Sequence, residues 1–387
     1  MSVFRIGDDF RRAQVAIAAL FCFLGFQYAT WASRLPALKV ELGLSEAEVG
    51  LLLMACGVGA AGSYPLVGPL MRRLGSRRLT FLSAFALGLL LLALAAAPNY
   101  PVALLIICLD GVAVGCLNVA MNAQGAALEV LYERTALSQL HATFSAGSLG
   151  AALLASGMNL WTASLAAHFG VAAVILLLLI AYSRSGLLTE DPQPESEEGK
   201  SRPKLILPSR VMIWMGLAMA FATVTEGAMN DWSALYMENV VNVGAEVAPL
   251  GIAVVSVMMV VARLFADGWR TRWGDDRVVR TGSVLAGSGL AVALLVGGLA
   301  PTLAGFACVG IGIAVVTPCL YVAAARQGPD ALALVAAMGT TGLLAGPAMI
   351  GFIASASSLL WGMSAVAVSA LLVFACATRI RWKVVSH

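Results

Sequence analysis

The sequence contains few charged residues. Asp, Glu, Lys and Arg together make up 12% of the 387 residues, whereas 60% are hydrophobic. A soluble domain usually carries about 25% charged residues, so this composition excludes a chain whose whole surface faces water. In place of charge, the sequence has runs of about 20 apolar residues, the length that crosses the hydrocarbon core of a lipid bilayer. It therefore predicts an all-α membrane protein.

The sequence has only three histidines, and their positions do not favour a catalytic site. His141, His168 and His387 fall in a predicted span, a loop and the tail, whereas an enzyme needs a nucleophile and base or a metal at one depth. No P-loop is present, so ATP is not expected as the energy source. The seven cysteines lie in apolar runs without metal-site spacing. We expect no enzyme activity, no cofactor and no metal.

The apolar runs predict twelve membrane spans. Their approximate bounds are 13–34, 46–70, 78–97, 101–126, 137–160, 164–183, 211–236, 247–268, 278–299, 302–325, 331–354 and 357–378. An even number of spans places both termini on one side of the membrane.

Basic residues predict which side that is. All but two of the 24 Lys and Arg residues fall on the side of the termini, the exceptions being Arg34 and Lys39. Because Lys and Arg concentrate in cytoplasmic loops, both termini are predicted to be cytoplasmic, in a bacterial inner membrane. The net charge of +3 is explained by this bias and requires no nucleic-acid partner.

One long hydrophilic segment divides the chain. It contains the acidic, proline-bearing run TEDPQPESEEGKSRPK, a composition that stays solvated. We predict an N-terminal six-helix bundle at 1–183, a cytoplasmic linker at 184–210 and a C-terminal six-helix bundle at 211–387.

The two predicted bundles contain related loop sequences. GPLMRRLGSRR follows the second span and DGWRTRWGDDR follows the eighth, which aligns Gly75 with Gly274. This indicates duplication of a six-helix unit, and two such halves facing each other are typical of secondary transporters.

The first of these loops resembles the cytoplasmic loop signature of the major facilitator superfamily. The matching residues are Gly68, Leu70, Gly75, Arg77 and Arg78. Arg72 occupies the position where the family has an acid, whereas the second copy keeps an acid, Asp267, four residues after Arg263. That spacing places both on one helix face. We expect these residues to act in conformational change: Gly68, Arg72, Gly75, Arg263 and Asp267.

Three further segments resemble the fucose-permease-like branch of that superfamily: GCLNVAMNAQ at 115–124, RTALSQLHATFSAGSLGA at 134–151 and EGAMNDWSALYM at 226–237. The resemblance covers essentially the whole chain. It implies the major facilitator fold, with twelve transmembrane helices in two pseudo-symmetric six-helix bundles and spans one, four, seven and ten around a central cavity. Sugar–proton symporters of this branch have an acid where this chain has Asn118.

Polar side chains at bilayer depth are costly, so each is a candidate for function. Those on the four cavity spans are the predicted substrate-binding residues: Gln27, Tyr28, Trp31, Asn118, Asn122, Glu226, Asn230, Thr317 and Tyr321. The alternatives are interfacial anchoring for the aromatic residues of the first span, and helix-to-helix hydrogen bonding for the others. Pro318 removes an amide donor and is expected to bend the tenth span.

Four titratable residues are candidates for proton coupling: Asp110, Glu226, Asp231 and His141. Asp110 is expected to be buried without an obvious local partner, in a position to bind and release a proton. The alternatives are a structural pair for Asp110, a solvated position near the outer interface for Asp231, and a structural role for His141.

These observations favour a secondary active transporter. We expect a monomer that moves a small polar solute, sugar-like or otherwise hydroxylated, by alternating access and symport with protons. The alternative within the class is a drug or metabolite exporter working by proton antiport. The alternatives from other classes are a membrane-embedded enzyme and a non-transporting receptor.

Overall fold

The computed structural model describes residues 9–134, 136–188, 209–380 and 382, and leaves the side chain of Asp267 undescribed. Most of the predicted linker at 184–210 therefore lies outside the described residues, and the domain bounds stay predictions. The helices are α1 (Asp9–Ala32), α2 (Leu35–Leu42), α3 (Glu46–Ala95), α4 (Tyr100–Tyr132), α5 (Leu137–Asn159), α6 (Leu165–Ser183), α7 (Arg210–Asn239), α8 (Leu250–Trp273), α9 (Asp275–Val296), α10 (Leu299–Ile313), α11 (Val316–Gln327), α12 (Pro329–Ala356) and α13 (Leu359–Ala377).

These helices make twelve membrane passes, which confirms the predicted fold class. Helix α3 is 50 residues long and contains two passes, whereas α10 and α11 together form one apolar stretch, Leu299–Gln327. Helix α2 has only eight residues, about 12 Å at 1.5 Å per residue, and cannot cross a bilayer. It was not anticipated from the sequence.

Two glycines at equivalent positions in the two loops interrupt the helices and change the direction of the chain. Gly75 interrupts α3 with φ 73° and ψ 163°, and Gly274 separates α8 from α9 with φ 82° and ψ 152°. A positive φ with an extended ψ is a conformation that essentially only glycine adopts. The same backbone geometry thus occurs in both copies of the loop that the sequence aligned.

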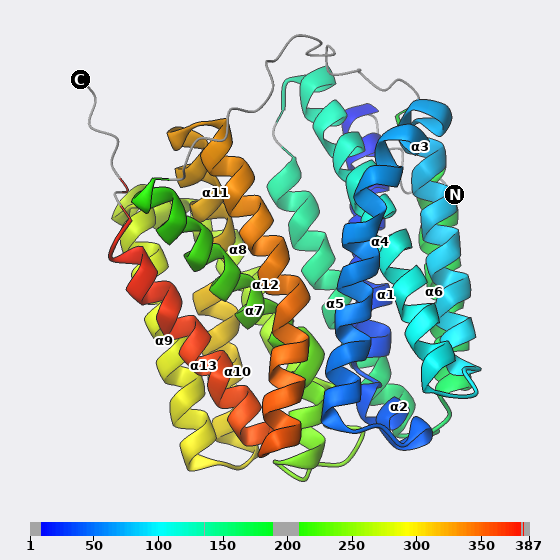
Figure 1. The fold of residues 1–387 in the computed structure, drawn as a ribbon. Coiled ribbons are helices and arrows are strands. Elements are labelled where there is room, and N and C mark those ends of the chain that lie inside the picture. Colours follow the sequence, from blue (N-terminus) through cyan, green and yellow to red (C-terminus); the bar gives the residue numbers. More distant parts are fainter. Residues whose placement is uncertain (1–8, 135, 189–208, 381, 383–387) are drawn as a thin grey trace, which may run out of the picture.

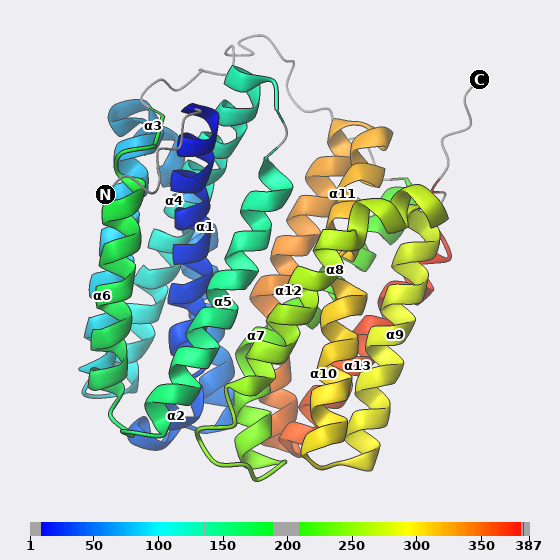
Figure 2. The ribbon, with the colours of Figure 1, turned by 180° about the vertical axis from the view of Figure 1, so that it is seen from behind.

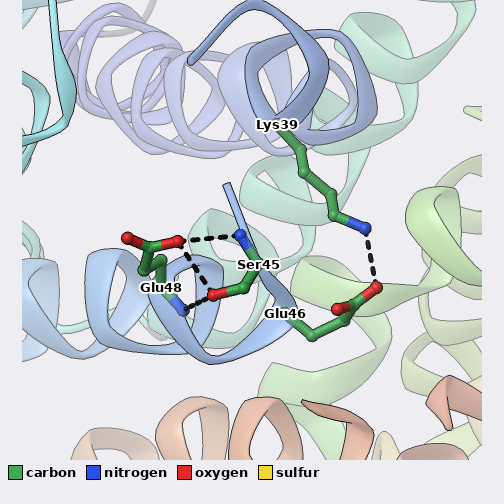
Figure 3. Close-up of polar contacts among 4 residues, drawn as sticks. All are labelled: Lys39, Ser45, Glu46 and Glu48. Carbon is green, nitrogen blue, oxygen red and sulfur yellow. Dashed lines mark hydrogen bonds and ion pairs between the residues drawn. The ribbon is translucent and has the colours of Figure 1, made fainter. Parts of the chain in front are cut away.

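The turn between α2 and α3 is specified by its own residues (Figure 3). Gly43 ends α2 with φ 65°, and Ser45 begins α3. The Ser45 hydroxyl accepts a hydrogen bond from the Glu48 backbone N–H while the Glu48 carboxylate accepts one from the Ser45 N–H, at 2.8 Å. This reciprocal capping satisfies helix donors that would otherwise be unpaired. Lys39 pairs with Glu46 at 2.7 Å and ties α2 to α3.

The tenth pass bends where proline predicts it. Helix α10 ends at Ile313 and α11 begins at Val316. Pro318 has no N–H to give to the carbonyl four residues earlier, which belongs to Ala314. The break at Ala314 and Val315 confirms the expected bend, while its use in gating stays a prediction.

The helices form two bundles that lie side by side (Figure 1). Helices α1 to α6 pack on one another, as do α7 to α13, and the bundles meet chiefly where α3 contacts α12 and α5 contacts α8. Helix α1 begins and α13 ends at the same end of the molecule, here called the termini end; the opposite end carries α2 and is called the α2 end. The bundles touch at the α2 end and diverge toward the termini end (Figures 1 and 2).

Glycines allow the close approach at the α2 end. A Cβ added to Gly50 in α3 would lie 2.9 Å from the Pro347 carbonyl oxygen and 3.1 Å from the Gly351 Cα of α12. Both neighbours are backbone atoms, so the helices can pack this closely only without a side chain at Gly50.

Candidate functional site

A hydrogen bond between the bundles connects two candidate residues from different halves of the sequence. The Tyr28 hydroxyl of α1 donates to Oδ1 of Asp231 in α7. Asp231 is 2% exposed, so the expected alternative, a solvated carboxyl near the outer interface, is wrong. Helix α7 carries it into the contact between bundles because α1 and α7 pack together there.

A second buried hydrogen bond lies beside the first, within the first bundle. Gln27, the neighbour of Tyr28 on α1, donates through Nε2 to Oδ1 of Asp110 in α4 at 2.8 Å. Asp110 is buried as expected, and its partner comes from a neighbouring helix, which agrees with the alternative of a structural pair. Thus Gln27 and Tyr28, consecutive residues of α1, each bind one carboxyl group: Gln27 binds Asp110 of the first bundle and Tyr28 binds Asp231 of the second.

Some polar atoms of this cluster lack partners. Asp110 Oδ2 and Gln27 Oε1 are both buried and accept no hydrogen bond from the described residues. A buried polar group without a partner costs about 1–3 kcal/mol. A proton on Asp110 would remove its buried charge, and its use as a proton carrier stays a prediction.

Arg263 links three helices across the boundary between bundles. Its Nη1 donates to Ser145 Oγ of α5 at 2.7 Å, and its Nη2 to Glu226 Oε1 of α7 at 3.2 Å. Arg263 lies about 20 Å into α8 from Leu250, at 1.5 Å per residue. Arg263 lies inside the eighth span, as the predicted bounds 247–268 place it, and its guanidinium reaches the interior contact between α5, α7 and α8.

The amides of α4 occupy a more open position. Asn118 is exposed and Asn122 half-buried, and Asn122 Nδ2 donates to Asn118 Oδ1 at 2.6 Å. The equivalent amide of α7, Asn230, donates to the Glu226 backbone carbonyl one turn earlier, at 3.1 Å. The substrate-binding amides predicted on the fourth span are therefore at least partly accessible and are already paired with each other.

The remaining substrate candidates divide between buried and accessible positions. Trp31 is 1% exposed and packs edge-on against Tyr28, so it does not anchor the chain at an exposed interface. Thr317 lies just after the bend of the tenth pass with a buried, unpartnered hydroxyl. Tyr321, one turn further along, is 37% exposed.

The remaining candidates are His141, predicted for proton coupling, and the residues predicted for conformational change. His141 is exposed on α5 with its ring against Phe21. Arg72 is exposed and Gly68 half-buried near the end of the first pass of α3. The side chain of Asp267 lies outside the described residues, so its pairing with Arg263 stays a prediction.

Sequence analysis missed the residues that connect the bundles at the α2 end. Ser156 and Asn159 of α5 donate to the backbone carbonyls of Glu246 and Ala245, which precede α8. It also gave no role to Ser145, although its hydroxyl accepts the Arg263 hydrogen bond. A serine or asparagine near a helix end is common, and only the packing of the bundles reveals its partner.

Comparison with known proteins gives consistent matches. The family model described as Major Facilitator Superfamily matches residues 15–330. An uncharacterised MFS-type transporter of Yersinia pestis is 32% identical over 376 residues, which cover 94% of each chain.

Two solved structures share the arrangement of the helices. The D-xylose–proton symporter aligns with a TM-score of 0.75 at 14% identity, over 95% of this chain and 98% of that one. The fucose:proton symporter FucP of E. coli aligns with a TM-score of 0.64 at 16% identity, over 96% and 99%. Identities this low show the fold alone.

Proposed function

Because the chain belongs to the major facilitator superfamily and is a multi-pass membrane transporter of small molecules rather than an enzyme, we propose that it carries a small hydroxylated solute together with protons. Transport proceeds by alternating access, with the two bundles rocking about a site near the middle of the membrane.

The observation that carries this proposal is the pair of polar links between the bundles. Tyr28 joins Asp231, and Ser145 joins Arg263 with its partner Glu226. Tyr28 and Asp231 lie toward the α2 ends of α1 and α7, so this link must break when the bundles separate at that end, whereas the Ser145–Arg263 link lies further toward the termini end. Each link involves a carboxyl group, Asp231 in the first and Glu226 in the second. Protonation of that group changes the strength of the link, so proton binding is coupled to the rocking of the bundles.

The direction of opening follows from the basic residues. With the termini end assigned to the cytoplasm by the positive-inside rule, the contacts at the α2 end close the periplasmic side. The divergence of the bundles then opens toward the cytoplasm. In this conformation Asn118 and Tyr321 are exposed, as expected for side chains that meet a solute.

The solute class is supported by the accessible chemistry. Amides, hydroxyls and aromatic rings at Asn118, Asn122 and Tyr321 suit a molecule with several hydroxyl groups. Among the solved transporters with this fold, two are described as xylose–proton and fucose–proton symporters and another as a nucleoside transporter, which agrees with a hydroxylated solute.

Flux measurements test the proposal. The purified chain in proteoliposomes is expected to accumulate a hydroxylated solute, chosen by a thermal-shift screen of sugars, polyols and sugar acids, when the outside is made acidic. Glu226→Gln should abolish the response to the pH gradient, because the amide cannot take up or release a proton. Asp9→Asn, at the exposed start of α1, is the matched control and should behave as wild type.

Three outcomes would contradict parts of the proposal. Flux that is the same with and without a pH gradient would refute proton coupling. Proton movement opposite to the solute would refute symport and identify an antiporter. Absence of flux for every solute that binds would refute transport and favour a receptor.

A further inference from the structure

Arg263 has donors available beyond its two partners. A guanidinium has five N–H donors, and the hydrogen bonds to Ser145 and Glu226 use two of them. None of the Arg263 nitrogens is among the buried atoms that lack a partner. The Arg263 and Glu226 side chains are 22% and 28% exposed. The side chain that carries the remaining donors is therefore partly accessible.

The ion pair of Arg263 and Glu226 is a single contact. One nitrogen meets one carboxylate oxygen at 3.2 Å, whereas the strongest arginine–carboxylate pairs use two parallel hydrogen bonds. Another carboxylate that approaches the unused donors could make the bidentate arrangement and displace Glu226.

The two members of the pair differ in whether they can change charge. Arginine stays protonated in proteins, so its positive charge inside the membrane must be compensated throughout the cycle. Glu226 is the described residue that forms an ion pair with it. Because only the carboxyl of this pair can be neutralised, the charges balance in two ways: ionised Glu226 beside Arg263, or protonated Glu226 with another anion bound to Arg263.

From this geometry we infer that the transported solute carries a carboxylate as well as hydroxyl groups, so that its class is that of sugar acids. The solute carboxylate binds Arg263 in place of Glu226, and Glu226 takes up one proton from the water on the side to which the site is open. One proton and one monovalent anion then cross together without net charge. This inference rests on the proposed transport function and adds the charge of the solute.

The other charged groups near Arg263 are compatible with an incoming anion. His141 of α5 lies within electrostatic range of Arg263, and Asp267 on α8 itself has an undescribed side chain. Helix α10, which packs on α8, has no Asp, Glu, His, Lys or Arg. The charged residues of α9 lie in its first turns at the termini end.

Among the acids whose side chains the structure describes, two others inside the predicted spans are buried and already hydrogen-bonded. Asp110 and Asp231 are each 2% exposed and accept hydrogen bonds from Gln27 and Tyr28. Glu226 is therefore the acid that an incoming carboxylate would meet, and its release from Arg263 leaves it free to accept the proton.

Matched pairs of solutes test the inference on the full chain. Binding of gluconate and galacturonate is compared with that of glucose and galactose by thermal shift and by uptake into proteoliposomes. Sugar acids are expected to bind at least tenfold more tightly than their neutral counterparts. Arg263→Gln should remove this preference, while Arg272→Gln, an exposed arginine on the same helix, should retain it.

A second variant distinguishes a binding role from a structural one. Glu226→Gln leaves Arg263 without its competing carboxylate, so sugar acids should bind at least tenfold more tightly than to wild type. This affinity should lose the pH dependence that protonation of Glu226 supplies. Proton uptake with the anion, followed by an enclosed pH dye, should disappear. A purely structural pair would give weaker binding, so this variant remains informative if Arg263→Gln fails to fold.

The inference and the proposed function fail in different ways. Proton-driven uptake of neutral sugars with no effect of Arg263→Gln would overturn the inference and leave transport intact. Weaker sugar-acid binding to Glu226→Gln would also overturn it. Absence of flux for every solute would instead refute the proposed function.

Discussion

Tyr28 offers the most direct test of how the bundles are held together. Replacing it with Phe keeps the aromatic ring beside Trp31 and removes only the hydroxyl that donates to Asp231. Because this bond joins α1 to α7, its loss weakens the conformation that is closed at the α2 end. The bond is necessarily lost in the conformation where the bundles separate there, so the open conformation gains population.

The size of the effect follows from the type of bond. A hydrogen bond to an ionised acceptor contributes about 1.5–3 kcal/mol, and 1.4 kcal/mol corresponds to a tenfold change in an equilibrium constant. Tyr28→Phe should therefore shift the equilibrium toward opening at the α2 end by roughly 10- to 100-fold.

Hydrogen–deuterium exchange measures this equilibrium without labels. Amides in the contact between the end of α5 and the connection before α8 should lose protection by the same factor, because exchange reports the opening equilibrium. Tyr100→Phe is the control, since its hydroxyl donates to the Glu48 carbonyl within the first bundle, at 3.3 Å. Unchanged exchange in Tyr28→Phe would show that this bond does not hold the bundles together.

Four further substitutions test the glycines. Gly50→Ala places a methyl group 2.9 Å from the Pro347 carbonyl oxygen and should wedge α3 from α12, increasing exchange at the α2 end; Gly62→Ala on the same helix meets nothing within 4 Å and should have no such effect. Gly75→Ala and Gly274→Ala each force alanine into a glycine conformation, at a cost of about 1–3 kcal/mol, so each should lower the thermal unfolding temperature. Equal exchange in Gly50→Ala and Gly62→Ala would contradict the first expectation. Unchanged unfolding temperatures of the Gly75→Ala and Gly274→Ala proteins would contradict the second.

The candidate site was only partly predictable from the sequence. The polar residues stand out because a charged or amide side chain is rare in an apolar run, so Asp110, Glu226 and Asp231 could be found without a structure. Their partners could not, because Tyr28 and Asp231 are separated by 203 positions along the chain. Periodicity assigns a residue to a helix face but does not say which helix that face meets.

The partners of Arg263 could not be predicted from the sequence either. Its position toward the inner end of the eighth span fits an arginine counted by the positive-inside rule, and its spacing to Asp267 fits a pair on one helix. The structure instead turns it inward, where Ser145 and Glu226 supply an acceptor and a counter-charge. A long arginine side chain can reach in either direction, and only the neighbouring helices decide which partner is closer.

The sequence by itself determined the number and position of the membrane passes, the loop glycines of the two copies and the bend before Pro318. These follow from local physics: apolar length against bilayer thickness, the conformational freedom of glycine and the missing donor of proline. Only the tertiary structure decided which end of the bundles is closed and which acids share a partner across them. Those outcomes depend on contacts between helices that are distant in sequence. The missing side chain at Gly50 sets how closely α3 approaches α12, and the Tyr28 hydroxyl supplies a bond between α1 and α7. No local sequence pattern describes either contact.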